Sequence, residues 1–138
     1  MKKDWLVLLA VLVLGIVIGL GCHVAIGQQT APTEPKGTKV FKSSALDLGT
    51  KFEQLKGWRL SMHMVQIEPG GHSPMHSHKD RPGMACVAQG VMTEQRGGKT
   101  TEYRVGDIMV DDKGTTHWLE NKGTEPVLFV IAEITKAP

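Results

Sequence analysis

The residues best suited to chemistry in this chain are three histidines in two separate stretches. His76 and His78 stand two residues apart in the segment Gly70–His78, and His117 lies in a later stretch. On an extended strand, residues two apart point to the same face, which would place the first two imidazoles roughly 6–7 Å apart at their Cβ atoms. Imidazole nitrogens bind divalent transition metals at about 2.0–2.1 Å. The first pair alone is also compatible with a histidine-rich surface turn, because Gly, Ser and Pro surround it.

Four further residues, His72, Asp80, Glu94 and Glu102, are candidates for a supporting role, and His63 is not. His72 precedes the histidine pair, and we expect either a base near a pocket mouth or a solvent-exposed ring. Asp80, Glu94 and Glu102 are the carboxylates that could add a ligand, but acidic side chains are usually solvated, so we expect each on the surface. His63 has apolar neighbours on both sides, which indicates a packed or interface histidine rather than a ligand.

The elements that must position these residues are short strands. Trp58–Ile67 is apolar on both of its alternating faces, so we expect it to line a barrel and to pack outward, on a partner subunit. Glu68–Gly71 predicts a turn. Short strand candidates separated by glycines are typical of a sandwich or small barrel, so the sequence predicts an all-β domain. The other candidates are Thr38–Ser43, Met84–Gln89, Val91–Arg96, Thr100–Val105, Asp107–Val110, Thr115–Glu120 and Val127–Thr135.

Two motifs resemble those of the cupin superfamily. In the second motif, over residues 106–121, Asp112 replaces the proline of the family pattern, and the remaining positions match at Gly106, Gly114, His117 and Asn121. In the first motif, over residues 70–90, Gly83 stands where the family has glutamate, and the matches are Gly70, His76, His78 and Gly90. The resemblance implies a double-stranded β-helix, or jelly-roll barrel, over residues 38–138. It also implies that His76, His78 and His117 point into the barrel as ligands of a divalent transition metal.

The departure at Gly83 bears on the chemistry of that site. Three neutral histidines would leave the full +2 charge on the metal and keep coordination positions open, which predicts an anionic or chelating small molecule as ligand. The three-histidine iron cupins, including thiol dioxygenases and diketone-cleaving dioxygenases, are similar in this respect. We therefore expect iron first, with manganese, zinc, nickel or copper as alternatives.

Two functions follow from this reading. The first is a metal-dependent enzyme, a dioxygenase or an isomerase of a small organic molecule. The second is a non-catalytic module that binds a small molecule or a metal, including copper, since methionine thioethers accompany the histidines. A purely structural barrel ranks third.

The N-terminal stretch predicts export. Residues 1–27 read as a signal peptide or transmembrane anchor, because Lys2 and Lys3 precede the uncharged run Trp5–Gly21. The sequence leaves retention, cleavage and lipidation at Cys22 open; if retained, residues 5–26 would form an apolar helix through the membrane. Residues 28–37 predict a flexible linker.

The charge of the chain limits its partners. The formal net charge is only +2 and no basic stripe is present, so no nucleic-acid binding is expected. We expect an extracytoplasmic homodimer that binds a small molecule.

Overall fold

The structure is a computed structural model that describes residues 30–137 of the 138-residue chain. The chain from Ala31 onward forms one compact unit. The apolar helix and the signal or anchor segment expected near the N-terminus lie outside the described residues. Within residues 30–137, no helix is both long and apolar enough to cross a bilayer.

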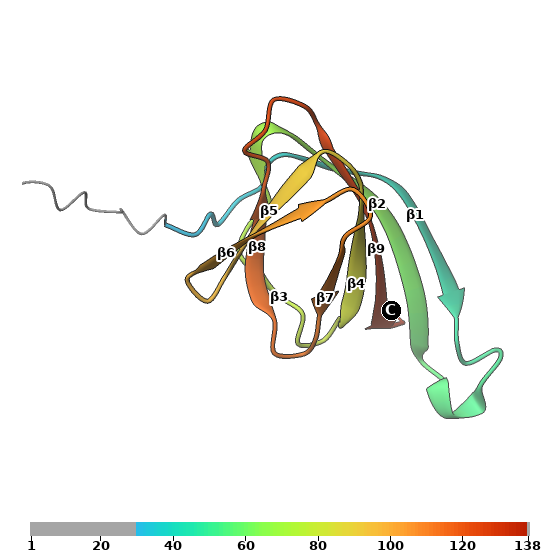
Figure 1. Cartoon of the computed structure of the whole chain (residues 1–138). Helices are drawn as coiled ribbons and strands as arrows, with labels where there is room; N and C mark the ends of the chain where they lie inside the picture. The colour runs from blue at the N-terminus through green and yellow to red at the C-terminus, as the bar shows by residue number, and fades with distance from the viewer. Residues whose placement is uncertain (1–29, 138) are drawn as a thin grey trace, which may run out of the picture. The chain divides into compact units, whose positions relative to one another are not determined.

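The described domain is an all-β jelly-roll barrel that is nearly closed, as Figure 1 shows. Its strands follow the order β6-β5-β8-β2-β9-β4-β7, with β1 paired to β2 and β3 paired to β8. Successive strands in the chain are mostly not neighbours in this sheet, so residues far apart in sequence meet inside it. The strands are β1 (Lys36–Asp47), β2 (Trp58–His72), β3 (His76–Ser77), β4 (Gly83–Gln89), β5 (Val91–Arg96), β6 (Lys99–Arg104), β7 (Ile108–Asp111), β8 (Thr116–Glu120) and β9 (Val127–Lys136).

The all-β prediction is confirmed, and the structure corrects it in two places. The turn expected at Glu68–Gly71 is wrong, because these residues bulge within β2 opposite the single residue Gly37 of β1. Gly70 has a positive φ of 70°, which glycine adopts without strain. Strand β1 begins at Lys36, inside the range expected as linker, and a 3₁₀ turn (Glu53–Leu55) connects it to β2.

The inner face of the barrel carries the hydrophobic core. Along β2, Ser61, Val65 and Ile67 are buried and, being an even number of residues apart, share one face. Val65 and Ile67 pack with apolar side chains of the other strands to form the core of the barrel. The core cluster consists of Val65, Ile67, Ala85, Val87, Met92, Met109, Leu119, Val127 and Phe129.

The outer face of the same sheet is also apolar, and here it is open. Leu60 lies between Leu46 and Ile134 in register, and in the next row Met62 and Met84 flank Ala132. The exposed fractions are 37% for Leu60 and 52% for Met62. The outward packing expected for this strand is thus not supplied by the described part of the chain itself.

Candidate metal centre

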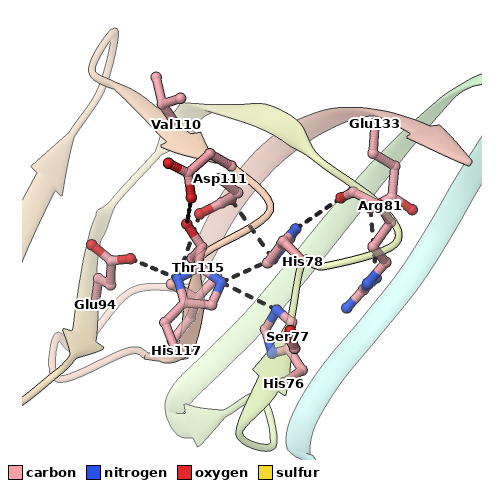
Figure 2. Close-up of polar contacts among 12 residues, drawn as sticks. His76, Ser77, His78, Arg81, Glu94, Val110, Asp111, Thr115, His117 and Glu133 are labelled. Atoms are coloured by element: carbon pink, nitrogen blue, oxygen red, sulfur yellow. Dashed lines mark hydrogen bonds and ion pairs between the residues drawn. The ribbon is translucent and has the colours of Figure 1, made fainter.

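The three histidines predicted as ligands come together because two short strands pair. His76 on β3 is the register partner of His117 on β8. His78 follows β3, and its backbone N–H donates to the carbonyl of Thr115 at 2.9 Å, just ahead of β8. Figure 2 shows the three rings turned toward one another. The ring centroids lie 4.7–5.0 Å apart.

Hydrogen bonds at the far side of each ring fix its tautomer. The Nδ1 atom of His76 lies 2.9 Å from the carbonyl oxygen of Pro74, and that of His78 lies 3.1 Å from the carbonyl of Arg81. The Nδ1 of His117 lies 2.6 Å from a carboxylate oxygen of Glu94 (Figure 2). Carbonyl and carboxylate oxygens only accept, so in each neutral ring Nδ1 carries the proton and Nε2 is left with a lone pair.

The three Nε2 atoms converge on one point. The Nε2 of His117 lies 3.1 Å from that of His78 and 3.2 Å from that of His76. With Nδ1 protonated, none of these atoms has a proton to share, so their lone pairs face each other. Two nitrogens bound at right angles to a metal at ~2.1 Å would be ~3.0 Å apart. The spacing and the donor type therefore fit a divalent transition metal.

Burial keeps the imidazoles of His76 and His78 in the neutral form that binds metals. Desolvation lowers the pKa of His76 from 6.5 to about 4, against the opposing effect of the hydrogen bond to Pro74. Desolvation also lowers the pKa of His78, although the carboxylate of Asp111 acts in the other direction. Both rings are accordingly uncharged at neutral pH.

Glu94 was expected on the surface, and that expectation is wrong. It is only 2% exposed and bonds to His117, while Arg96 donates to the same Glu94 oxygen at 2.7 Å through Nε. Burial alone would raise the pKa of Glu94, but the hydrogen bonds from His117 and Arg96 hold it below its usual value. Such a carboxylate behind a ligand histidine orients the ring and increases its basicity. Alternation was the missed signal, since Glu94 shares a face of β5 with the buried Met92.

Asp111 adds a second buried carboxylate beside the three-histidine cluster. Its Oδ1 accepts from Arg96 at 2.8 Å, whereas its Oδ2 is buried, accepts no hydrogen bond and lies 3.8 Å from the Nε2 of His78. Burial raises the pKa of Asp111 despite the attraction of His117, His78 and Arg96. When both carboxylates are ionised, Glu94 and Asp111 carry one more charge than the guanidinium balances. A bound cation would offset that excess.

The structure explains why the family glutamate is missing at position 83. Gly83 lies between Asp111 on β7 and Glu133 on β9 in one row of the sheet. A Cβ atom at Gly83 would stand 2.4 Å from the carbonyl oxygen of Ala132 and 2.9 Å from the Cβ of Glu133. No side chain fits there without moving β9.

The cluster opens on a pocket of about 220 Å³. All three histidines line it, together with apolar side chains that include Val65, Met109 and Phe129. On another part of the wall lie three polar side chains whose part in the pocket the sequence did not indicate: His63, Arg81 and Glu133. The pocket thus combines a fixed set of metal donors, an apolar lining and a second polar group.

The remaining sequence candidates lie elsewhere. His72 does not line the pocket; its ring packs edge-on against Trp118 with centroids 6.3 Å apart. Asp80 and Glu102 are exposed, as expected. The exposed methionines, Met62, Met75 and Met84, do not line the pocket.

The comparisons with known proteins agree with this fold. The sequence profile of the Cupin domain family matches residues 63–133, just over half of the chain, so the chain belongs to the cupin family. Among curated proteins, it is 29% identical to germin-like protein 5-1 of Oryza sativa subsp. japonica over 65% of the chain. It is 27% identical to auxin-binding protein ABP19b of Prunus persica over 66% of the chain. The chain spans less than half the length of each relative, 44% and 46%.

Solved structures show the same fold. A conserved protein with a double-stranded β-helix domain from Klebsiella pneumoniae superposes with a TM-score of 0.55 at 21% identity, covering 76% of this chain and 85% of that one. A protein described as a predicted oxalate decarboxylase from Thermotoga maritima superposes with a TM-score of 0.52 at 21% identity, covering 80% and 96%.

Proposed function

We propose that this protein is an exported or membrane-anchored cupin that binds a divalent transition metal through His76, His78 and His117. The metal would present open positions to a small anionic or chelating organic molecule. The convergence of three unprotonated Nε2 atoms at the wall of a pocket carries this proposal. Iron ranks first because the site resembles that of the three-histidine iron cupins; imidazole ligands also suit zinc, nickel and copper.

The activity we propose is that of a metal-dependent oxidoreductase of the dioxygenase type, or of an isomerase. When bound, the metal supplies Lewis acidity or electron-transfer chemistry. The chain's own residues do the rest: Glu94 holds the ring of His117, Arg96 holds Glu94, and the apolar lining keeps water away from the ligand.

The test of the metal site is elemental analysis of the full chain, purified without chelator or metal-affinity resin. We expect close to one equivalent of a transition metal, as isolated or after loading with iron, manganese, zinc or copper. Less than about a tenth of an equivalent in every case would overturn the proposal. Oxygen uptake by the iron-loaded protein with small chelating acids and diketones then tests the dioxygenase activity.

A second candidate function is binding without turnover. The name of the Prunus persica relative, an auxin-binding protein, supports it, since that name describes a ligand rather than a reaction. Under this alternative the pocket would hold a small molecule or the metal itself, copper included. Saturable ligand binding without product, over hours with each metal, would favour the binding module over the enzyme.

We also propose a homodimer formed through the outer sheet face. Support comes from the apolar rows around Leu60 and Met62, which the described chain leaves open. Sedimentation of the full chain in mild detergent would show a dimer, and Met62→Asp would shift it to the monomer. A monomer at micromolar concentration would count against this arrangement.

A further inference from the structure

The pocket has a second polar end, formed by Glu133, His63 and Arg81, which we call the Glu133 end. Glu133 lies on β9, and only 6% of it is exposed. One carboxylate oxygen, Oε1, lies 3.4 Å from the Nε2 of His63. The other, Oε2, is buried, accepts no hydrogen bond and lies 3.6 Å from Nη1 of Arg81. Figure 2 labels both side chains.

A buried carboxylate oxygen without a hydrogen bond is costly, so its retention needs an explanation. Leaving such a group unsatisfied destabilises the folded state by the full cost of removing it from water. The residue occupies space that could have been apolar, since its neighbours along the pocket wall include Phe129 and Ile131. Position 83 is confined to glycine by the carbonyl oxygen of Ala132 and by the Cβ of Glu133 itself. The unsatisfied oxygen therefore points to a partner that is not part of the protein.

The chemistry of this end defines that partner. An ionised carboxylate only accepts hydrogen bonds, so the partner must donate one. The guanidinium of Arg81 already stands beside the carboxylate, which disfavours a cationic partner and favours a neutral hydroxyl. A pocket of about 220 Å³ is smaller than the ~300–1,000 Å³ typical of drug-sized ligands, so the partner belongs to a small molecule.

We propose that Glu133 binds a hydroxyl group of the ligand whose other end is held at the three-histidine metal centre. The ligand class is then a small hydroxylated acid or ketone, chelating at one end and donating a hydrogen bond at the other. His63 lies beside the carboxylate, 3.4 Å from its Oε1, and is itself oriented by Ser43, whose Oγ lies 2.9 Å from its Nδ1. This inference rests on the proposed metal centre and adds the identity of the ligand's second end.

The test uses the zinc-loaded full chain, because zinc has no redox chemistry and binding can be measured without turnover. Calorimetry would compare 2-oxo acids of increasing length that end in methyl with their counterparts that end in hydroxyl. We expect the wild-type protein to favour the hydroxyl compound about tenfold or more at one chain length, which is the effect of a hydrogen bond to a charged group. Glu133→Leu should abolish this preference and leave zinc stoichiometry unchanged.

Two further variants make the result decisive. Glu133→Gln keeps the shape of the side chain and removes its charge, so the preference should fall at least threefold even if the leucine variant does not fold. Glu102→Gln, at an exposed carboxylate of β6, should keep the full preference. If zinc binds but no chain length shows a preference, or if both Glu133 variants retain it, this inference is overturned while the metal centre stands. If zinc fails to bind the wild-type protein, the metal centre fails as well.

Discussion

The two polar ends of the pocket differ in how firmly their side chains are held. At the histidine end, each ring is fixed by an acceptor 2.6–3.1 Å from its Nδ1. At the Glu133 end, the contacts are 3.4 and 3.6 Å long and one oxygen has no hydrogen bond. A metal tolerates little variation in bond length, so its ligands must be positioned in advance. An organic ligand can complete a looser site as it binds. The histidine end is therefore formed before a ligand binds, whereas the Glu133 end is completed only when the ligand binds.

Removing one histidine should have the largest effect on metal binding. His76→Ala should weaken zinc binding by more than about 100-fold, since loss of an outer partner alone typically costs 10–100-fold. His76 is only partly buried, so the barrel should remain folded. Competition with a chromophoric chelator measures the affinity. His72→Ala is the matched control, because His72 does not line the pocket, and it should bind zinc like the wild type. If the zinc affinity of His76→Ala stayed within tenfold of the wild type, His76 would not be a metal ligand.

Weakening the hydrogen bond that orients His117, without removing a ligand, should have a smaller effect on zinc affinity. Glu94→Gln should weaken zinc binding about 10–100-fold, because a neutral amide orients His117 less well than the carboxylate does. The same chelator competition applies, with circular dichroism to verify folding. Glu102→Gln changes an exposed glutamate and should have no effect. Equal affinities of these two variants would show that the bond to His117 does not matter for the metal.

The row of Asp111, Gly83 and Glu133 runs between the two ends of the pocket, and it can be tested at Gly83. Gly83→Ala should lower the free energy of unfolding by about 1–3 kcal/mol, since its Cβ would meet the backbone of β9. Urea denaturation measures the loss. Gly114→Ala places its Cβ at an ordinary 3.4 Å from Asp112 and should cost less, about 0.5 kcal/mol or under. Full stability of Gly83→Ala would show that the contacts of a Cβ atom do not exclude a side chain at this position.

The smallest effect is expected at the Glu133 end, from removing the side chain that supports His63. Ser43→Ala removes the hydroxyl beside His63 at an exposed position. The hydroxyl preference of the pocket should fall by no more than about threefold, because a typical hydrogen bond contributes about 1 kcal/mol and this one acts indirectly. Zinc affinity should not change at all. A large loss of zinc binding in this variant would show that the histidine end depends on the Glu133 end, which we do not expect.

Sequence reasoning was sufficient for the fold, and it singled out the three histidines that the structure brings close together. Two spaced motifs and the alternation of apolar residues gave the barrel, and the strand spacing of His76 and His78 placed them on one side. The meeting with His117 depends on the pairing of β3 with β8, which only the family resemblance implied.

The Glu133 end could not be predicted in the same way. His63 belongs to a strand that is apolar on both faces, so alternation did not show which face lines a pocket. Glu133 is brought opposite it by the register of β2 with β9, and register depends on bulges and turns that one sequence does not reveal. The row of Asp111, Gly83 and Glu133 likewise exists only once three strands are aligned.

A hydrogen bond made by the residues ahead of β1 limits how far the domain can be shortened at its N-terminal side. The carbonyl of Pro32 accepts the N–H of Met75 at 2.7 Å, next to His76, and Thr38 and Val40 of β1 line the pocket. A truncated protein that starts at residue 38, the boundary expected from sequence, would lose that anchor of the metal-binding loop. One that starts at or before Ala31 would keep it, so the shortest form fit for biochemistry includes part of the expected linker.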